Sequence, residues 1–139
     1  MKKTYFLALA IVIFGGCTST KKLKDFSDNN IIFGSGGGIA GITNEYVLHY
    51  NGKIEKINSI TKDVSQIENV SRQQSKKIFQ QFLDNGLDTL EYSVPGNMSY
   101  FVGFRNDSLT KKITWGGEGE TPPKAKETYY NLIQLINNK

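Results

Sequence analysis

The sequence predicts an α+β domain, in which an antiparallel sheet of about five strands follows the order β-β-β-α-β-β-α and two helices pack on one face. Short segments rich in β-branched and aromatic residues are separated by turns containing Gly, Pro and Asn, which indicates strands joined by hairpins. Two further segments carry apolar side chains at helical spacing, and each follows a predicted hairpin. Runs of strands followed by single helices favour separate sheet and helix layers.

Strands make up the first half of the predicted domain. The first strand, over 31–41, becomes rich in glycine toward its end, and the second covers 42–50. Asn51-Gly52 predicts a two-residue hairpin turn, because both residue types tolerate a positive φ. A returning strand over 53–57 follows. Residues 60–70 fit either a loop or a ragged sheet edge.

The first helix is predicted to begin after Ser71, because Ser71 and Gln74 fit a capping box, in which each side chain bonds the backbone N–H of the other residue. Gly86 is expected to end it, since glycine readily adopts the left-handed conformation found after helices. Apolar side chains recur between these limits at helical spacing and form the predicted core stripe: Ile78, Phe79, Phe82 and Leu83.

A second hairpin is predicted over 98–115, after a turn at 95–97. Its first strand alternates, with Met98, Tyr100, Val102 and Phe104 on one face and Phe101 on the other. The last helix covers 121–137 and opens with Thr121 and Pro122. Its predicted core stripe is Ala125, Tyr129, Leu132, Ile133 and Ile136.

The first 17 residues resemble the signal of a bacterial lipoprotein. Two lysines follow Met1, an apolar run covers 5–14, and Gly15-Gly16 precedes Cys17. The apolar run is too short to span a bilayer, which needs about 20 residues. The segment 14–17 is similar to a lipobox, which implies cleavage after Gly16 and acyl chains such as palmitate on Cys17. The alternative is an ordinary secretory peptide with a stray cysteine.

The sequence therefore divides into a lipoprotein signal peptide over 1–16, a flexible tether over 17–30 and a single α+β domain over 31–139. The tether is polar and charged, so it cannot bury enough apolar surface to fold alone. Either its lysines favour anionic lipid headgroups or the segment serves only as a spacer. Thr18, in place of Asp, favours the outer membrane by resemblance to general lipoprotein sorting, and we expect the domain to face the periplasm.

The charge distribution argues against nucleic acid as a partner. The chain carries a formal net charge of +4, but from residue 31 onward it holds 12 basic and 11 acidic side chains. The excess positive charge thus belongs mainly to the signal peptide and the tether. A nearly neutral domain offers no electrostatic support for binding phosphates along a nucleic acid.

No catalytic, metal or cofactor site is predicted. His49 is the single histidine and Cys17 the single cysteine, so neither a structural zinc site nor an intrachain disulfide can form. Glu118 and Glu120, near Trp115, could mimic a glycosidase pair or a cation site. General acid–base catalysis requires one carboxyl in an apolar pocket, whereas these lie in a glycine-rich loop and are expected to be solvated.

The glycine-rich segment is the most unusual feature of the domain. Gly36, Gly37 and Gly38 fit either a structural bulge or corner, or an edge that another chain approaches closely. A phosphate-binding loop is disfavoured, because neither known glycine fingerprint is met. Phe101 and Tyr130 are the aromatic residues expected to face outward. We therefore predict partner contacts at these five residues.

Ser35–Ile42, which reads S-G-G-G-I-A-G-I, resembles the glycine-rich opening of emfourin-like proteins, which inhibit thermolysin-type metalloproteases. The family has Phe where this chain has Gly38 or Ile39. The resemblance implies an α+β fold and a protein-binding role. The resulting expectation is a membrane-anchored, non-catalytic binding module of the protease-inhibitor class. The alternative is a structural or assembly lipoprotein that docks on an envelope complex through its sheet edge.

Overall fold

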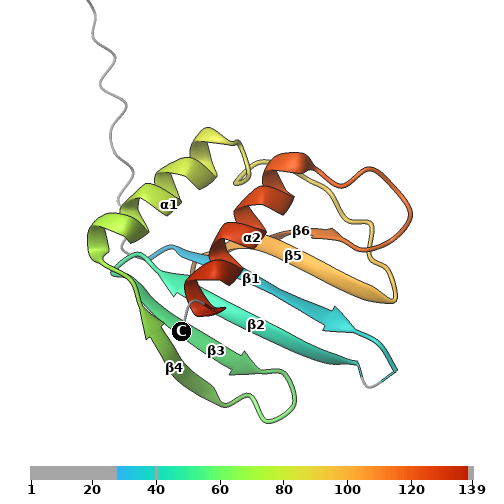
Figure 1. Cartoon of the computed structure of the whole chain (residues 1–139), viewed down its shortest axis with the longest axis horizontal. Helices are drawn as coiled ribbons and strands as arrows, with labels where there is room; N and C mark the ends of the chain where they lie inside the picture. Colours follow the sequence, from blue (N-terminus) through green and yellow to red (C-terminus); the bar gives the residue numbers. More distant parts are fainter. Residues whose placement is uncertain (1–27, 40, 138–139) are drawn as a thin grey trace, which may run out of the picture.

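The computed structural model describes residues 28–39 and 41–137, which form one six-stranded sheet with two helices on one of its faces (Figure 1). The signal peptide and most of the tether lie outside the described residues. The elements are β1 (Asn30–Gly37), β2 (Ile42–His49), β3 (Lys53–Asn58), β4 (Val64–Asn69), α1 (Arg72–Asp84), β5 (Met98–Arg105), β6 (Thr110–Trp115) and α2 (Pro123–Asn137). The predicted α+β class with antiparallel strands is confirmed.

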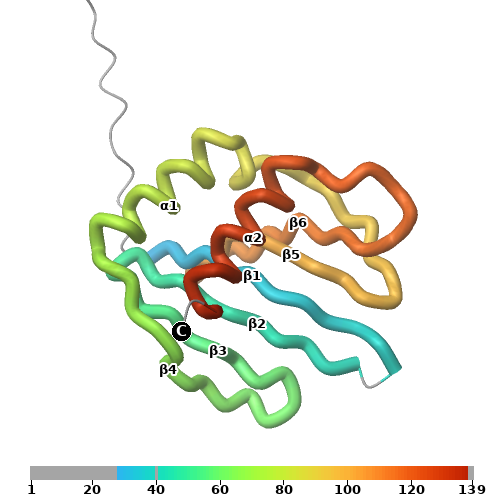
Figure 2. The backbone as a smooth tube through the Cα atoms, in the orientation of Figure 1, coloured from blue at the N-terminus to red at the C-terminus, as the bar shows by residue number. Residues whose placement is uncertain are grey.

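The sheet order is β4-β3-β2-β1-β5-β6, and all neighbouring strands are antiparallel. The first strand of the domain thus lies inside the sheet, where all eight residues of β1 pair with both β2 and β5. The trace in Figure 2 shows how the second hairpin returns to the far side of β1 after α1. Only the long-range pairing of β1 with β5 joins the two halves into one sheet.

The sheet has six strands where about five were predicted, because β4 forms within residues 60–70, a segment whose sequence fits either a loop or a ragged sheet edge. Its residues Val64, Ser65 and Gln66 are exposed, so the strand lacks the alternation that marks a half-buried strand. It forms because β3 offers an unpaired row of backbone groups. A register shift between Ile54 and Glu55 marks an irregularity in this pairing.

The Asn51-Gly52 turn forms as predicted, but by a different use of the two residues. Gly52 has a φ of +99°, and its N–H donates to the carbonyl of His49 over 2.9 Å. Asn51 keeps a negative φ and instead accepts a hydrogen bond from the N–H of Lys53 through its side-chain oxygen. The asparagine therefore stabilises the turn through its side chain, as an Asx turn does.

Helix α1 begins as the sequence predicts. The Ser71 hydroxyl accepts a hydrogen bond from the Gln74 N–H over 3.1 Å. Ser75, which is fully buried, donates to the carbonyl of His49 and fixes the start of α1 above the end of β2. The described core joins both helices to the sheet, and its buried members are Ile31, Phe33, Leu48, Ile54, Phe79, Phe82, Leu87, Val102, Ile113, Trp115, Ala125, Tyr129 and Leu132.

Candidate functional site

His49 lies at the end of β2 on the face of the sheet that carries no helix. Its Nε2 is 2.7 Å from Glu55 Oε2, and Lys53 also bonds this carboxylate. These hydrogen bonds hold the pKa of Glu55 below its ordinary value. A carboxylate kept charged by two basic neighbours acts as a structural ion pair. Within residues 28–39 and 41–137, no Ser, Cys or Thr side chain is hydrogen-bonded to the imidazole.

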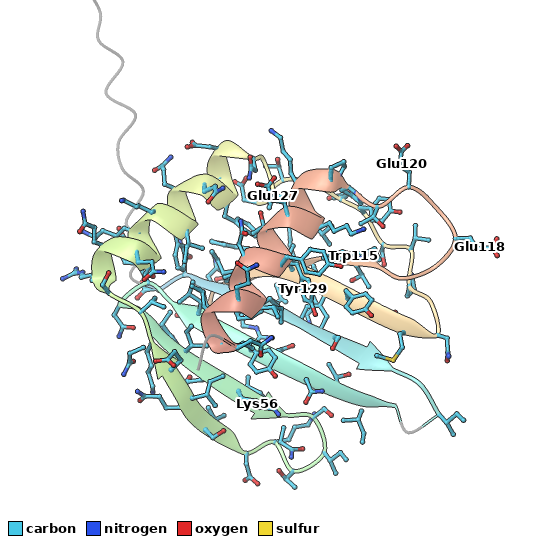
Figure 3. The ribbon with its side chains drawn as sticks, in the orientation of Figure 1. Lys56, Trp115, Glu118, Glu120, Glu127 and Tyr129 are labelled. Atoms are coloured by element: carbon cyan, nitrogen blue, oxygen red, sulfur yellow. The ribbon has the colours of Figure 1, made fainter. Side chains whose placement is uncertain are left out.

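Glu118 and Glu120 are exposed on the loop between β6 and α2 and point away from the molecule (Figure 3). This position lacks the apolar surroundings that general acid catalysis requires. Within residues 28–39 and 41–137, no group of three or more His, Cys, Asp or Glu side chains is placed to hold a metal ion. The same part of the chain contains no helix with the length and apolar character needed to cross a bilayer.

The helix-free face of the sheet is closed by an ion network. Glu45 on β2 bonds Arg105 on β5 over 2.6 Å and Lys112 on β6 over 2.9 Å. Because β1 lies between β2 and β5, these side chains pass over it. Burial alone would raise the pKa of Glu45, but hydrogen bonds and charges from Lys112 and Arg105 outweigh burial, so its pKa lies below the ordinary value.

Phe101 lies on this helix-free face, as predicted, but it is only 5% exposed. Its ring covers Gly34 on β1, where any Cβ would collide with the carbonyl of Asn44 and press on the ring. The ammonium of Lys112 lies 4.4 Å from the ring centroid on the β6 side. Phe101 therefore offers no exposed ring for a partner, in contrast to what its place in the alternation suggested.

The three glycines predicted to contact a partner have different surroundings. Gly37 has a φ of +122°, and a Cβ there would collide with the carbonyl oxygen of Asn97, so the backbone itself requires glycine. At Gly36 a Cβ would meet the side chain of Thr43. At Gly38 it would meet only the Met98 sulfur, at 3.7 Å. Gly37 is thus structural, and Gly38 borders open space.

Three exposed apolar side chains lie on the helix-bearing face at the end of the sheet next to the β1–β2 hairpin, and a fourth, Tyr130 on α2, is linked to Tyr100 through the ring of Tyr129. Ile42, Met98, Tyr100 and Tyr130 are 46%, 45%, 37% and 54% exposed. We call these four residues the hairpin-end patch. Gly37 pairs with Ile42 on one side and Met98 on the other, so a position without a side chain separates two apolar ones. Figure 1 shows that β1, β2 and β5 continue past α2 at this end.

A buried aromatic cluster supports the hairpin-end patch from behind. Tyr129 of α2 makes edge contacts with Tyr100 and Trp115, with ring centroids 5.6 and 5.5 Å apart, and Figure 3 shows Trp115 and Tyr129 side by side. Burial raises the pKa of Tyr129, although its hydrogen bond to Ser35 on β1 opposes this shift. Tyr130 in turn contacts Tyr129 at 5.7 Å. The exposed rings of Tyr100 and Tyr130 therefore both contact the buried ring of Tyr129.

A concave region lies between the two helices. It encloses about 170 Å³, and its lining combines apolar and uncharged polar side chains from Gln74, Ile78, Gln81, Thr128, Asn131, Leu132 and Leu135. No charged side chain lines it, and the Thr128 hydroxyl has no acid or base beside it in this lining. Because several of these residues also belong to the helix packing, the groove is a feature of the core rather than a separate candidate site.

The sequence predicted Tyr130 as an outward-facing contact residue, and the structure exposes it. It did not predict the other three patch residues, because alternation assigns Met98 and Tyr100 to the helix-bearing face and hence to the core. Met98 and Tyr100 do lie on the helix-bearing face, but α2 does not extend over this end of the sheet (Figure 1). Comparison of the sequence with models of known protein families and with curated proteins finds no match.

Proposed function

We propose that the chain is a lipid-anchored protein of the bacterial envelope whose domain binds another protein through the hairpin-end patch and has no catalytic role. The observation that carries this proposal is the exposure of four large uncharged side chains, three at one end of the sheet and Tyr130 linked to them through Tyr129. Single exposed apolar residues are normal, whereas contiguous ones mark interaction sites. Cores of protein interfaces are enriched in Tyr and Met and depleted of charge, and the patch has this composition.

The anchor in this proposal is an acylated Cys17 in the outer membrane, with the domain in the periplasm. Its support is the order of basic, apolar and small residues before Cys17. Cells that express the protein should incorporate labelled palmitate into it, and the Cys17→Ser variant should remain an unlabelled, uncleaved precursor. Labelling of the variant at the wild-type level would contradict acylation at this residue.

The first partner class is a thermolysin-type metalloprotease, which the resemblance at Ser35–Ile42 implies. The direct test adds the purified mature protein to thermolysin and measures hydrolysis of a peptide substrate. Ile42→Glu should relieve inhibition, while Leu109→Glu should not. Leu109 is a matched control, because it is also 46% exposed but lies in the turn between β5 and β6. Absence of inhibition by the unmodified protein would exclude this protease as a target.

The second partner class is an envelope complex that docks at the sheet edge. It is favoured by the difference between the two edges, since β4 has a strand on one side only, while β6 is partly covered by backbone hydrogen bonds from Tyr92 and Val94. A photo-crosslinking residue placed at Ser65 in living cells should form protein adducts if the edge docks. The same residue at Ile42 should form them if the patch binds.

A further inference from the structure

A small concave region lies at the end of β2, where the β2–β3 turn meets the start of α1 (Figure 1). It encloses about 160 Å³ and is lined by His49, Tyr50, Asn51 and Arg72. Pockets for drug-sized ligands typically measure roughly 300–1,000 Å³, so this one suits a single small chemical group. None of the four lining residues is acidic, and three of them carry N–H groups on their side chains. The concavity therefore offers mainly hydrogen-bond donors.

The two walls of this concavity are fixed to each other by hydrogen bonds and close packing. The N–H of Val70 donates to the carbonyl of Gly52 over 2.9 Å. The Ser75 hydroxyl donates to the carbonyl of His49 over 3.0 Å. A Cβ at Gly52 would collide with the Val70 carbonyl oxygen, so the turn and the chain before α1 approach as closely as glycine allows. The fold thus sets the spacing between the β2–β3 turn and the start of α1.

The donors on the two walls have no partner within residues 28–39 and 41–137. The chain has two arginines, and Arg105 is bonded to Glu45, whereas Arg72 forms no hydrogen bond or ion pair in this part of the chain. Asn51 accepts from the N–H of Lys53 through its side-chain oxygen, which leaves its NH₂ group as the free end of the amide. A planar guanidinium and an amide NH₂ therefore line one concavity with their donors unused.

A second cation lies beside the concavity. Lys76 follows Arg72 by about one turn of α1, and its ammonium lies 6.0 Å from the ring centroid of Tyr50. The carboxylate of Glu55, beside His49, is already bonded by two basic side chains, so its charge is balanced locally. An anion that enters the concavity would therefore meet two cations of α1.

We propose that this concavity binds a phosphate group, with Arg72 and Asn51 as its donors. The guanidinium fork matches two oxygens of a carboxylate or a phosphate. A carboxylate uses both of its oxygens on this fork, whereas a phosphate keeps further oxygens for the amide of Asn51. A phospholipid headgroup and a free phosphate ester present the same oxygens. The site is independent of the hairpin-end patch and of the protein partner proposed for it.

Binding is measured by nuclear magnetic resonance, with sodium phosphate titrated at constant ionic strength into the labelled protein in an uncharged detergent. The side-chain resonances of Asn51 and Arg72 should shift and saturate. Arg72→Gln should weaken binding roughly tenfold, because a charge-assisted bidentate contact is lost. Arg72→Lys should restore only part of the affinity, since lysine keeps the charge but not the fork.

The matched control is Lys77→Gln, which removes the same charge from the same helix at a position about 140° around its axis from Arg72. This variant should change the affinity by less than about twofold, because an exposed charge on another side of the helix is screened. Equal losses in Lys77→Gln and Arg72→Gln would overturn the site, since diffuse attraction to a basic helix would then explain the binding.

Asn51→Asp separates binding from folding. Aspartate keeps a side-chain oxygen for the N–H of Lys53, so the turn should persist, and the thermal transition checks this. The variant replaces the NH₂ donor by a carboxylate, so phosphate binding should fall at least about tenfold. An unchanged affinity would overturn the role of Asn51. Arg72→Gln removes no bond of the fold and decides the test if Asn51→Asp unfolds.

The chemical class and the source of the phosphate are tested with three further ligands. Sodium acetate should bind several-fold more weakly than phosphate, and equal affinity would overturn the preference for phosphate. Phosphatidylglycerol in the micelles presents a headgroup, whereas glycerol phosphate presents a soluble ester. Tighter binding of either one supports the proposal and identifies the source. Absence of shifts at Asn51 and Arg72 with both of these ligands and with inorganic phosphate would overturn it.

Discussion

Apolar side chains are shielded from solvent in different ways on the two faces of the sheet. On the helix-free face, Ile32 is fully buried and Phe101 is 5% exposed, although no helix covers them. Charged side chains from β2, β5 and β6 close over this face instead. On the helix-bearing face, Ile42, Met98 and Tyr100 stay exposed beyond α2. Long charged side chains therefore cover apolar residues on the helix-free face. No such side chains cover Ile42, Met98 and Tyr100 at the hairpin end of the other face.

The side chains that border an apolar residue determine whether it is covered. Long side chains such as Lys and Arg can cover apolar surface with their aliphatic stems while the charge stays in water. The sheet residues that border Ile42, Met98 and Tyr100 are short or uncharged, namely Ser35, Gly37 and Asn44. Exposure at this end thus depends on the short side chains that border these three residues.

The largest expected effect comes from the packed part of the helix-bearing face. Leu132→Asp places a charge among buried residues of α2 and should cost several kcal/mol, against a total stability of roughly 5–15 kcal/mol. The variant should lose its cooperative thermal transition, followed by circular dichroism. Asn131→Asp, at the exposed neighbouring position, should melt like the unmodified protein. A native-like transition in Leu132→Asp would mean that α2 does not pack as described.

The hairpin itself should be the next most sensitive site. Gly37→Ala should destabilise the fold by about 1–3 kcal/mol, because the added Cβ meets the Asn97 carbonyl and the φ is unfavourable. Gly38→Ala should cost roughly 1 kcal/mol, since only its positive φ is strained. Urea denaturation measures both. Equal effects would show that close backbone approach does not distinguish the two glycines.

The ion network on the helix-free face should contribute a pH-dependent stability. Glu45→Gln should lower the free energy of unfolding by about 1–3 kcal/mol at neutral pH. The folded-state pKa of Glu45 is lowered from 4.5, so the stabilisation is complete above that pH and is lost as the pH falls through the lowered value. Urea titrations at several pH values should therefore show the two proteins converging in acid. If the difference in free energy of unfolding between the two proteins stayed constant with pH, ionisation of Glu45 would not be the origin of the pH dependence.

The smallest effect on stability is expected in the hairpin-end patch. Tyr130→Ser should change the free energy of unfolding by no more than about 0.5 kcal/mol, because the ring is more than half exposed. The same variant should weaken the crosslinked adduct at position 42. A stability loss as large as that of Glu45→Gln would indicate that the patch belongs to the core, and the contrast between the two faces would then disappear.

Several structural elements could be predicted from sequence patterns that lie within a single segment. The Ser71 cap, the Gly86 stop and the stripe containing Phe79 and Phe82 depend on residues within one helix, so the sequence contains all the necessary partners. The turn at Gly52 is equally local. β4 could not be read in this way, because its residues are mostly exposed and its pairing depends on the free edge of β3.

The candidate site was predicted only in part. Tyr130 was expected to face outward and does so, while Phe101 was expected to do the same and is covered. The glycine-rich segment was correctly singled out for its backbone, since Gly37 has a φ that other residues rarely adopt. The remaining patch residues, Ile42, Met98 and Tyr100, have a pattern that is also typical of a core strand.

By itself, the sequence determined which face of each clear strand and helix is apolar, because that follows from a period of two or 3.6 residues along one segment. Only the tertiary structure decided which of those apolar residues are covered. Phe101 and Tyr100 are adjacent in the chain, yet Phe101 is shielded by Lys112 and Tyr100 remains open. The ion network over the helix-free face joins residues 60 and 67 positions apart. Burial depends on such distant neighbours, and no local pattern contains them.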